Sequence, residues 1–136
     1  MVEPVAEKRS RLRVVVIDDD QDSLNVTAAY LRRAGHEVTA TTRGAEGVNT
    51  VLASGSVDVL VTDVVMPEFD GIEVIRALRT KRPDLWIVAI SGGGPRLTPD
   101  MTLHYSRKLG ANRVLHKPFT KEDLLAALDR SAKPKS

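Results

Sequence analysis

The chain alternates between short apolar runs and longer segments in which apolar residues recur with a helical period. Three of the runs are nearly continuous in Val, Leu and Ile, which is typical of strands covered on both faces of a parallel sheet. Each run is followed by a helical segment, so the pattern predicts five strand–helix units in succession. The predicted strands are residues 12–17, 37–41, 57–62, 86–90 and 113–116.

The helical segments also carry start and stop signals. Gly35 provides a left-handed stop after the first of them. Pro99 is placed for the first turn of the fourth, and Thr120 forms a capping box with Asp123 at the start of the fifth. The predicted helices are residues 23–34, 45–52, 71–80, 97–109 and 121–130.

Short loops and right-handed crossovers between these elements predict a doubly wound α/β fold. We expect a five-stranded parallel sheet of the flavodoxin-like (βα)5 type, with strand order 2-1-3-4-5. A single domain is predicted over residues 12–131. Residues 1–11 are expected to form a disordered basic leader and residues 132–136 a C-terminal tail.

Composition narrows the class of protein. A length of 136 residues, with 42% apolar and 28% charged residues, suits one globular domain with its own core. The absence of cysteine excludes disulfides and thiolate metal sites. No apolar run approaches the roughly 20 residues that span a bilayer, and no secretory signal begins the chain, so we expect a cytoplasmic location and no membrane partner. With aromatics at 4%, nucleic-acid binding is poorly supported.

Polar residues that could bind a ligand or take part in catalysis follow four of the predicted strands. In an open α/β sheet the carboxyl ends of the strands share one edge, where ligands bind. Strands 1 and 3 are neighbours in the expected order, so their carboxylates should converge. Converging negative charges raise one another's pKa unless a cation lies among them, and hard oxygen ligands suit Mg²⁺. The residues concerned are Asp18 and Asp19 after strand 1, Asp63 at strand 3, Ser91 after strand 4 and Lys117 after strand 5.

With Mg²⁺ bound, this set of side chains suits phosphoryl transfer. Asp63 would be the carboxylate nucleophile. The metal would neutralise one phosphoryl oxygen, the Lys117 ammonium a second and the Ser91 hydroxyl a third, with main-chain amides of Gly92 and Gly93 assisting.

The motifs around these residues resemble a response-regulator receiver domain, the phosphorylated module of two-component signalling. The resemblance covers about residues 12–131. It is carried by Val15-Val16-Ile17-Asp18-Asp19-Asp20, Thr62-Asp63-Val64-Val65-Met66-Pro67, Asp70-Gly71, Ala89-Ile90-Ser91 and Lys117-Pro118-Phe119.

The resemblance implies a site and a donor. Asp18, Asp19 and Asp63 would hold Mg²⁺ together with the main-chain carbonyl of Val65. The Lys117–Pro118 peptide bond would be cis. Asp63 would accept phosphate from a sensor histidine kinase or a histidine phosphotransfer protein, so the chain is not an enzyme beyond catalysing its own phosphorylation and dephosphorylation.

The resemblance also implies an output surface and one departure from the family. Receivers commonly contact a downstream protein through helix 4, strand 5 and helix 5, and a homodimer is a further candidate assembly. Many receivers carry an aromatic switch residue where this chain has Val114, so switching is expected to rely on the loop and helix after Ser91. The predicted partner surface includes Tyr105, Lys108, Arg113 and Lys121.

The acidic run after the first predicted strand has other interpretations. Taken alone, Asp18, Asp19 and Asp20 could cap a helix. A calcium loop fails because Ser23 occupies the turn-glycine position and Ala29 the twelfth. A haloacid-dehalogenase-like phosphatase would use Asp18 as nucleophile, and a degenerate receiver would act without phosphorylation. A flavin- or ligand-binding flavodoxin-like domain is disfavoured, because it needs a phosphate-binding loop after strand 1, where three carboxylates would repel phosphate.

Overall fold

The computed structural model describes residues 11–64, 71–91, 108 and 110–130, which form a parallel five-stranded sheet. Its order is β2-β1-β3-β4-β5, which confirms the predicted doubly wound topology. β1 pairs in parallel with β2 and β3, and β3 pairs with β4. The strands are β1 (Arg13–Ile17), β2 (Glu37–Thr41), β3 (Val59–Asp63), β4 (Trp86–Ser91) and β5 (Arg113–His116).

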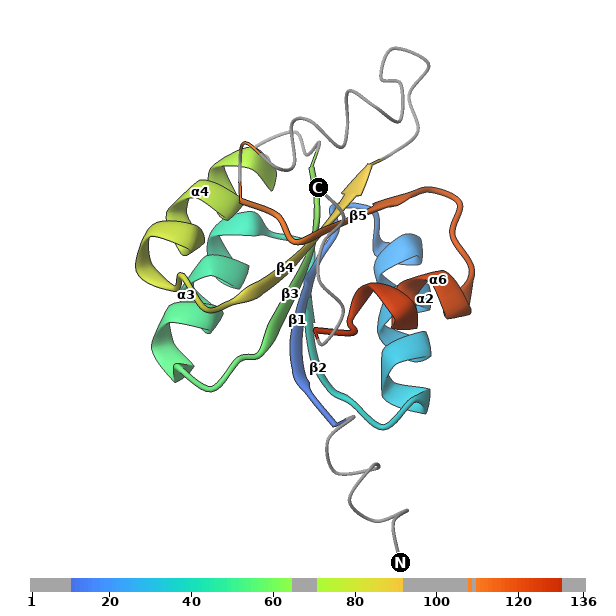
Figure 1. Cartoon of the computed structure of the whole chain (residues 1–136). Helices are drawn as coiled ribbons and strands as arrows, with labels where there is room; N and C mark the ends of the chain where they lie inside the picture. Colours follow the sequence, from blue (N-terminus) through green and yellow to red (C-terminus); the bar gives the residue numbers. More distant parts are fainter. Residues whose placement is uncertain (1–10, 65–70, 92–107, 109, 131–136) are drawn as a thin grey trace, which may run out of the picture.

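Helices cover both faces of the sheet. Figure 1 shows α2 and α6 on one side and α3 and α4 on the other. Of the predicted helix 97–109 only Lys108 is described, and nearly all of the predicted leader and tail lies outside the described residues. No described helix has the length and apolar character needed to cross a membrane. The described helices are α2 (Gln21–Arg33), α3 (Gly44–Ser54), α4 (Gly71–Lys81) and α6 (Lys121–Ala127).

Side-chain alternation along the central strands builds two hydrophobic layers. In β1, Val14 and Val16 face the layer under α2 and α6, whereas Val15 and Ile17 face the layer under α3 and α4. All five residues of β3 are buried. Burying one such aliphatic side chain contributes about 1.5–3 kcal/mol, so β1 and β3 form a firmly packed base for the residues that follow them.

Several helix boundaries differ from the predicted ones for local reasons. α2 begins at Gln21 rather than Ser23, because the Asp20 carboxylate caps it by accepting from the Ser23 amide at 3.1 Å. α6 ends at Ala127 rather than at residue 130. After Ala127 the amides of Leu128 and Asp129 donate to the main-chain oxygens three residues earlier, which tightens the last turn. The predicted capping box at the start of α6 is confirmed.

His36 links the end of the α2–β2 connection to the start of β1. Its Nδ1 accepts from the Leu12 amide at 3.0 Å, and burial lowers the pKa of the imidazole. The pKa of His36 is lower in the folded protein than in the unfolded chain. The neutral ring therefore stabilises the fold fully when the pH is above the unfolded-state pKa, and this stabilisation is lost as the pH falls through the folded-state pKa.

We therefore expect His36→Leu to cost about 1 kcal/mol of unfolding free energy at pH 8, because the Leu12 amide loses its acceptor. The difference between wild type and variant should shrink below about pH 6, as the protonated ring stops accepting. Urea unfolding of both proteins between pH 5 and 8 measures it. A difference that stays constant over this range would show that the ring's protonation has no part in the bond.

Candidate functional site

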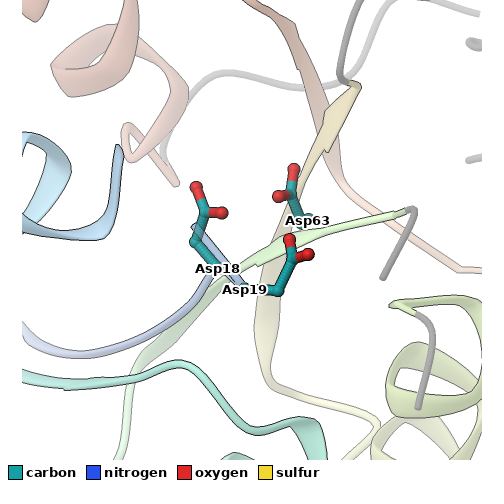
Figure 2. Close-up of side chains that lie close together, drawn as sticks. All are labelled: Asp18, Asp19 and Asp63. Atoms are coloured by element: carbon teal, nitrogen blue, oxygen red, sulfur yellow. The ribbon is translucent and has the colours of Figure 1, made fainter. Parts of the chain in front are cut away.

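Three carboxylates meet at the carboxyl edge of the sheet. Asp18 follows β1 and Asp63 ends β3, and the ladder pairs the preceding residues Ile17 and Thr62. One carboxylate oxygen from each of Asp18, Asp19 and Asp63 lies within 4.8 Å of the other two. Figure 2 shows these carboxylates gathered at the ends of the two strands. Asp18 and Asp63 are buried, whereas Asp19 is exposed to solvent.

Lys117 brings a cation to the two buried carboxylates. Its Nζ donates to Asp18 Oδ2 at 3.1 Å and to Asp63 Oδ2 at 3.4 Å. The residue directly follows β5, and its amide donates to the main-chain oxygen of Ser91 at 2.9 Å. The Lys117–Pro118 peptide bond is cis. The lysine therefore joins the end of β5 to the ends of β1, β3 and β4.

Burial and neighbouring charge set the protonation of the cluster. Burial, followed by a hydrogen bond and the negative charge of Asp18, raises the pKa of Asp63 to about 7, against the opposing charge of Lys117. Burial works against the charged form of Lys117, but its bonds and ion pairs with Asp18 and Asp63 outweigh this and raise its pKa. Near neutral pH the Asp63 carboxyl is therefore partly protonated, and a bound divalent cation would lower its pKa and favour the ionised form.

The acidic run after β1 is divided between two tasks. Asp18 Oδ1 accepts from the Asp20 amide at 3.0 Å, while the Asp20 carboxylate accepts from Ser23. The side-chain bond to Ser23 is the main cause that lowers the pKa of Asp20. The helix-cap interpretation therefore holds for Asp20, whereas Asp18 and Asp19 join the carboxylate cluster.

Of the remaining predicted residues, Lys121 begins α6 and Lys108 is described as helical, while the others lie on the strands beside the cluster or outside the described residues. Ser91 ends β4 and is buried. Val114 lies in β5 and is half-buried. Arg113 stacks over the Trp86 ring with its guanidinium carbon 4.9 Å from the centroid. Val65, Gly92, Gly93 and Tyr105 lie outside the described residues.

Gly71, the first residue of α4, lies beside the site, and the Asp-Gly motif alone did not predict this role. Its amide donates to the Val64 main-chain oxygen at 2.9 Å. A Cβ added here would overlap the main-chain oxygen of Asp63 and come within 2.7 Å of the Asp63 carbonyl carbon. The start of α4 therefore lies against the main chain of Asp63, and only glycine allows that approach.

The donor set fits a hard divalent cation. Three carboxylates within a few ångströms supply oxygen ligands of the kind that Mg²⁺ prefers, and the exposed Asp19 leaves one side of the cluster toward water. Two of the three carboxylates are buried, and the Lys117 ammonium contacts both. When all three are ionised, one positive charge faces three negative charges, so the cluster has a net negative charge. Such an excess favours a cation at the centre of the cluster.

Comparison with known proteins gives consistent matches over nearly the whole chain. A family model described as the response regulator receiver domain matches residues 14–129. Response regulator SaeR of Staphylococcus aureus is 27% identical over 116 residues, which cover 85% of this chain and 48% of SaeR. The chain thus spans about half the length of the curated relatives it matches.

Two solved structures illustrate the structural likeness. Chemotaxis protein CheY4 of Vibrio cholerae has a TM-score of 0.79 and 27% identity, covering 90% of this chain and 99% of that one. The BeF3-activated receiver domain of DrrB from Thermotoga maritima has a TM-score of 0.73 and 27% identity, covering 88% and 96% respectively.

Proposed function

Because this chain belongs to the family of response regulator receiver domains, we propose that Asp63 is its phospho-accepting residue. The observation that carries this proposal is the position of the Asp63 carboxylate, which shares the Lys117 ammonium with Asp18 at the carboxyl edge of the sheet. A nucleophilic carboxylate needs a neighbouring positive charge at which the phosphoryl oxygens can be held.

Mg²⁺ would be held by Asp18, Asp19 and Asp63, with the main-chain carbonyl of Val65 as a further ligand. When bound, the metal supplies positive charge to one phosphoryl oxygen. The three carboxylate oxygens already lie within 4.8 Å of one another, as a shared ion requires. The DrrB receiver, which is similar to this chain, has been solved in a BeF3-activated form, and its likeness supports an anion-binding site of this type.

The chain's own residues perform the transfer. An Asp63 oxygen forms a bond to phosphorus as the bond from phosphorus to the donor's imidazole nitrogen breaks, and the imidazole keeps that electron pair. Lys117 moves its ammonium contact from Asp63 to a second phosphoryl oxygen. The Ser91 hydroxyl and the Gly92 amide donate to the third. Charge on the three oxygens is thereby spread over fixed donors.

The chemistry identifies a class of partner and an output. The donor would be a phosphohistidine on a sensor histidine kinase or a histidine phosphotransfer protein, which we expect the chain to meet in the cytoplasm. The domain of residues 12–131 would act as a switch that changes a protein contact and would catalyse only its own phosphorylation and dephosphorylation. The contact surface would be helix 97–109, β5 and α6, with Val114 in place of an aromatic relay. A homodimer would be a further assembly of the chain.

The test is incubation with Mg²⁺ and acetyl phosphate, followed by intact mass and mapping of the modified residue. We expect one phosphoryl group on wild type and none on Asp63→Asn. Equal labelling of Asp63→Asn together with loss in Asp18→Asn would favour the phosphatase-like alternative. If wild type binds Mg²⁺ without being labelled, the chain is a degenerate receiver that acts through constitutive contacts.

Lys117→Met should separate phosphoryl transfer from metal binding. We expect labelling by acetyl phosphate at saturating Mg²⁺ to slow by about 100-fold, because one fixed charge on the phosphoryl oxygens is lost. Mg²⁺ affinity should rise, because the ammonium no longer neutralises Asp18 and Asp63. Isothermal titration and timed mass spectra measure the two effects. Lys121→Met, at the start of α6, is the matched control and should change neither.

A further inference from the structure

β5 lies at the edge of the sheet that the structure describes, with β4 as its one neighbouring strand there. Its ladder pairs it with β4, from Val88 with Arg113 to Ser91 with His116. Of the four described residues of β5, only Leu115 is buried. A slip of one residue would bring the apolar Val114 or the polar His116 to the place of Leu115. Because Val114 is apolar like Leu115, the hydrophobic pattern gives little preference for the observed register over a slip that buries Val114. A further interaction is needed to favour the observed register.

Asn112 supplies such an interaction at the start of the ladder. Its amide donates to the Ile87 main-chain oxygen at 2.7 Å, and its Oδ1 accepts from the Ile87 amide at 2.8 Å. The side chain and main chain of one residue thus bind both polar groups of Ile87. A slip of β5 would break both bonds and leave the Ile87 amide without this acceptor.

Arg79, in the last turn of α4, holds the two segments that lead into β4 and β5. Its Nη1 donates to the main-chain oxygens of Leu85 at 2.7 Å and Pro83 at 2.9 Å. Its Nη2 donates to the Gly110 oxygen at 2.6 Å and to Asn112 Oδ1 at 3.0 Å. One planar guanidinium therefore binds residues before both strands, which a lysine ammonium cannot reproduce.

The other end of the same ladder carries the phosphoryl-binding residues of the proposed function. The Lys117 amide donates to the Ser91 oxygen at 2.9 Å, and the Lys117 ammonium reaches Asp63. A one-residue slip of β5 would move Lys117 by about 3.3 Å along the strand and turn its side chain to the opposite face of the sheet. We propose that Arg79 and Asn112 are positioning residues that set the register of β5 on β4 and so bring Lys117 beside Ser91 and Asp63.

The proposal predicts a defined pattern in Asn112→Ala. The Lys117 amide should lose about ten-fold of its hydrogen-exchange protection relative to the Val61 amide of β3, because local opening of β5 becomes easier. Labelling by acetyl phosphate at saturating Mg²⁺ should slow by about ten-fold, because Lys117 is misplaced. Mg²⁺ affinity should not fall, because the three carboxylates lie on other segments and a misplaced Lys117 neutralises them less. Asn112→Asp keeps an acceptor for Ile87 and Arg79 and should restore wild-type values.

Two further variants separate positioning from loss of stability. Arg79→Lys should reproduce the effects of Asn112→Ala. Val51→Ala removes buried volume from α3 and should lower global stability, and with it the protection of Val61, without lowering the protection of the Lys117 amide or the labelling rate. Unchanged Lys117 protection in Asn112→Ala, or an equal loss of Lys117 protection in Val51→Ala, would overturn the proposal. The labelling measurement rests on the proposed phosphorylation of Asp63, whereas the exchange measurement does not, so failure of wild type to be labelled leaves the exchange result to decide.

Discussion

Asp63→Asn is expected to stabilise the metal-free protein by about 2 kcal/mol at pH 8, although it removes the central residue of the proposed site. The reason is that the fold holds the Asp63 carboxylate where burial and Asp18 oppose its charge. An asparagine of the same shape carries no charge, and Lys117 remains paired with Asp18 at 3.1 Å. Urea unfolding in the presence of a chelator measures the gain.

The pH dependence of this gain follows from the sign of the pKa shift. The pKa of Asp63 is about 7 in the fold, against its usual value of 3.8. Between these values the native protein binds more protons than the unfolded chain, so wild-type stability falls as pH rises through this window and is lowest above it. The advantage of Asp63→Asn should therefore be largest above pH 7 and vanish below about pH 4. An advantage that is independent of pH would show that the charge of Asp63 is not its cause.

Mg²⁺ should reverse the ranking of the two proteins. An ion that binds the folded protein stabilises wild type by about 2.7 kcal/mol at one hundred times its dissociation constant, and Asp63→Asn should gain far less. Asp19→Asn is the matched control within the cluster. Because Asp19 is exposed, that variant should gain little stability without metal and yet lose part of the response to Mg²⁺. A full Mg²⁺ response in Asp63→Asn would place the metal elsewhere.

The sequence predicted the sheet because its signals are local and repeated. Continuous aliphatic runs identify buried strands, and the alternation with amphipathic helices leaves few ways to order them. The convergence of Asp18, Asp19 and Asp63 at one edge then follows from strand order alone. Which member of the acidic run points into the cluster does not follow from it. The first turn of α2 decides this, because it takes Asp20 as its cap.

Contacts between side chains and distant main-chain groups were not predictable from the sequence. Arg79 fits an ordinary helix surface position by periodicity, yet its guanidinium binds main-chain oxygens in the segments before β4 and β5. The contact in which His36 accepts from the Leu12 amide likewise has no sequence signature. Such bonds depend on where the chain passes in three dimensions, so no residue spacing encodes them.

Gly71→Ala is expected to lower the free energy of unfolding by about 3 kcal/mol and to weaken Mg²⁺ binding. The added methyl group would meet the main-chain oxygen and carbonyl carbon of Asp63 and the Cα of Val64, none of which can rotate away. Relief requires the start of α4 to move from β3 or the end of β3 to shift. Either movement displaces the Asp63 carboxylate from Asp18 and Lys117. Urea unfolding and titration with Mg²⁺ measure the two effects.

Gly47→Ala provides the matched comparison, because the same methyl group meets a different kind of neighbour. Its Cβ would overlap the side-chain atoms Cδ1 and Cγ1 of Ile17 rather than main chain, and the Ile17 side chain can adopt another rotamer. Alanine inside α3 also gains about 1 kcal/mol of helix propensity over glycine, which offsets part of the crowding. We therefore expect a smaller loss of stability and unchanged Mg²⁺ affinity. If both alanine variants weakened Mg²⁺ binding equally, the effect of Gly71→Ala would come from general destabilisation and not from overlap with the Asp63 main chain.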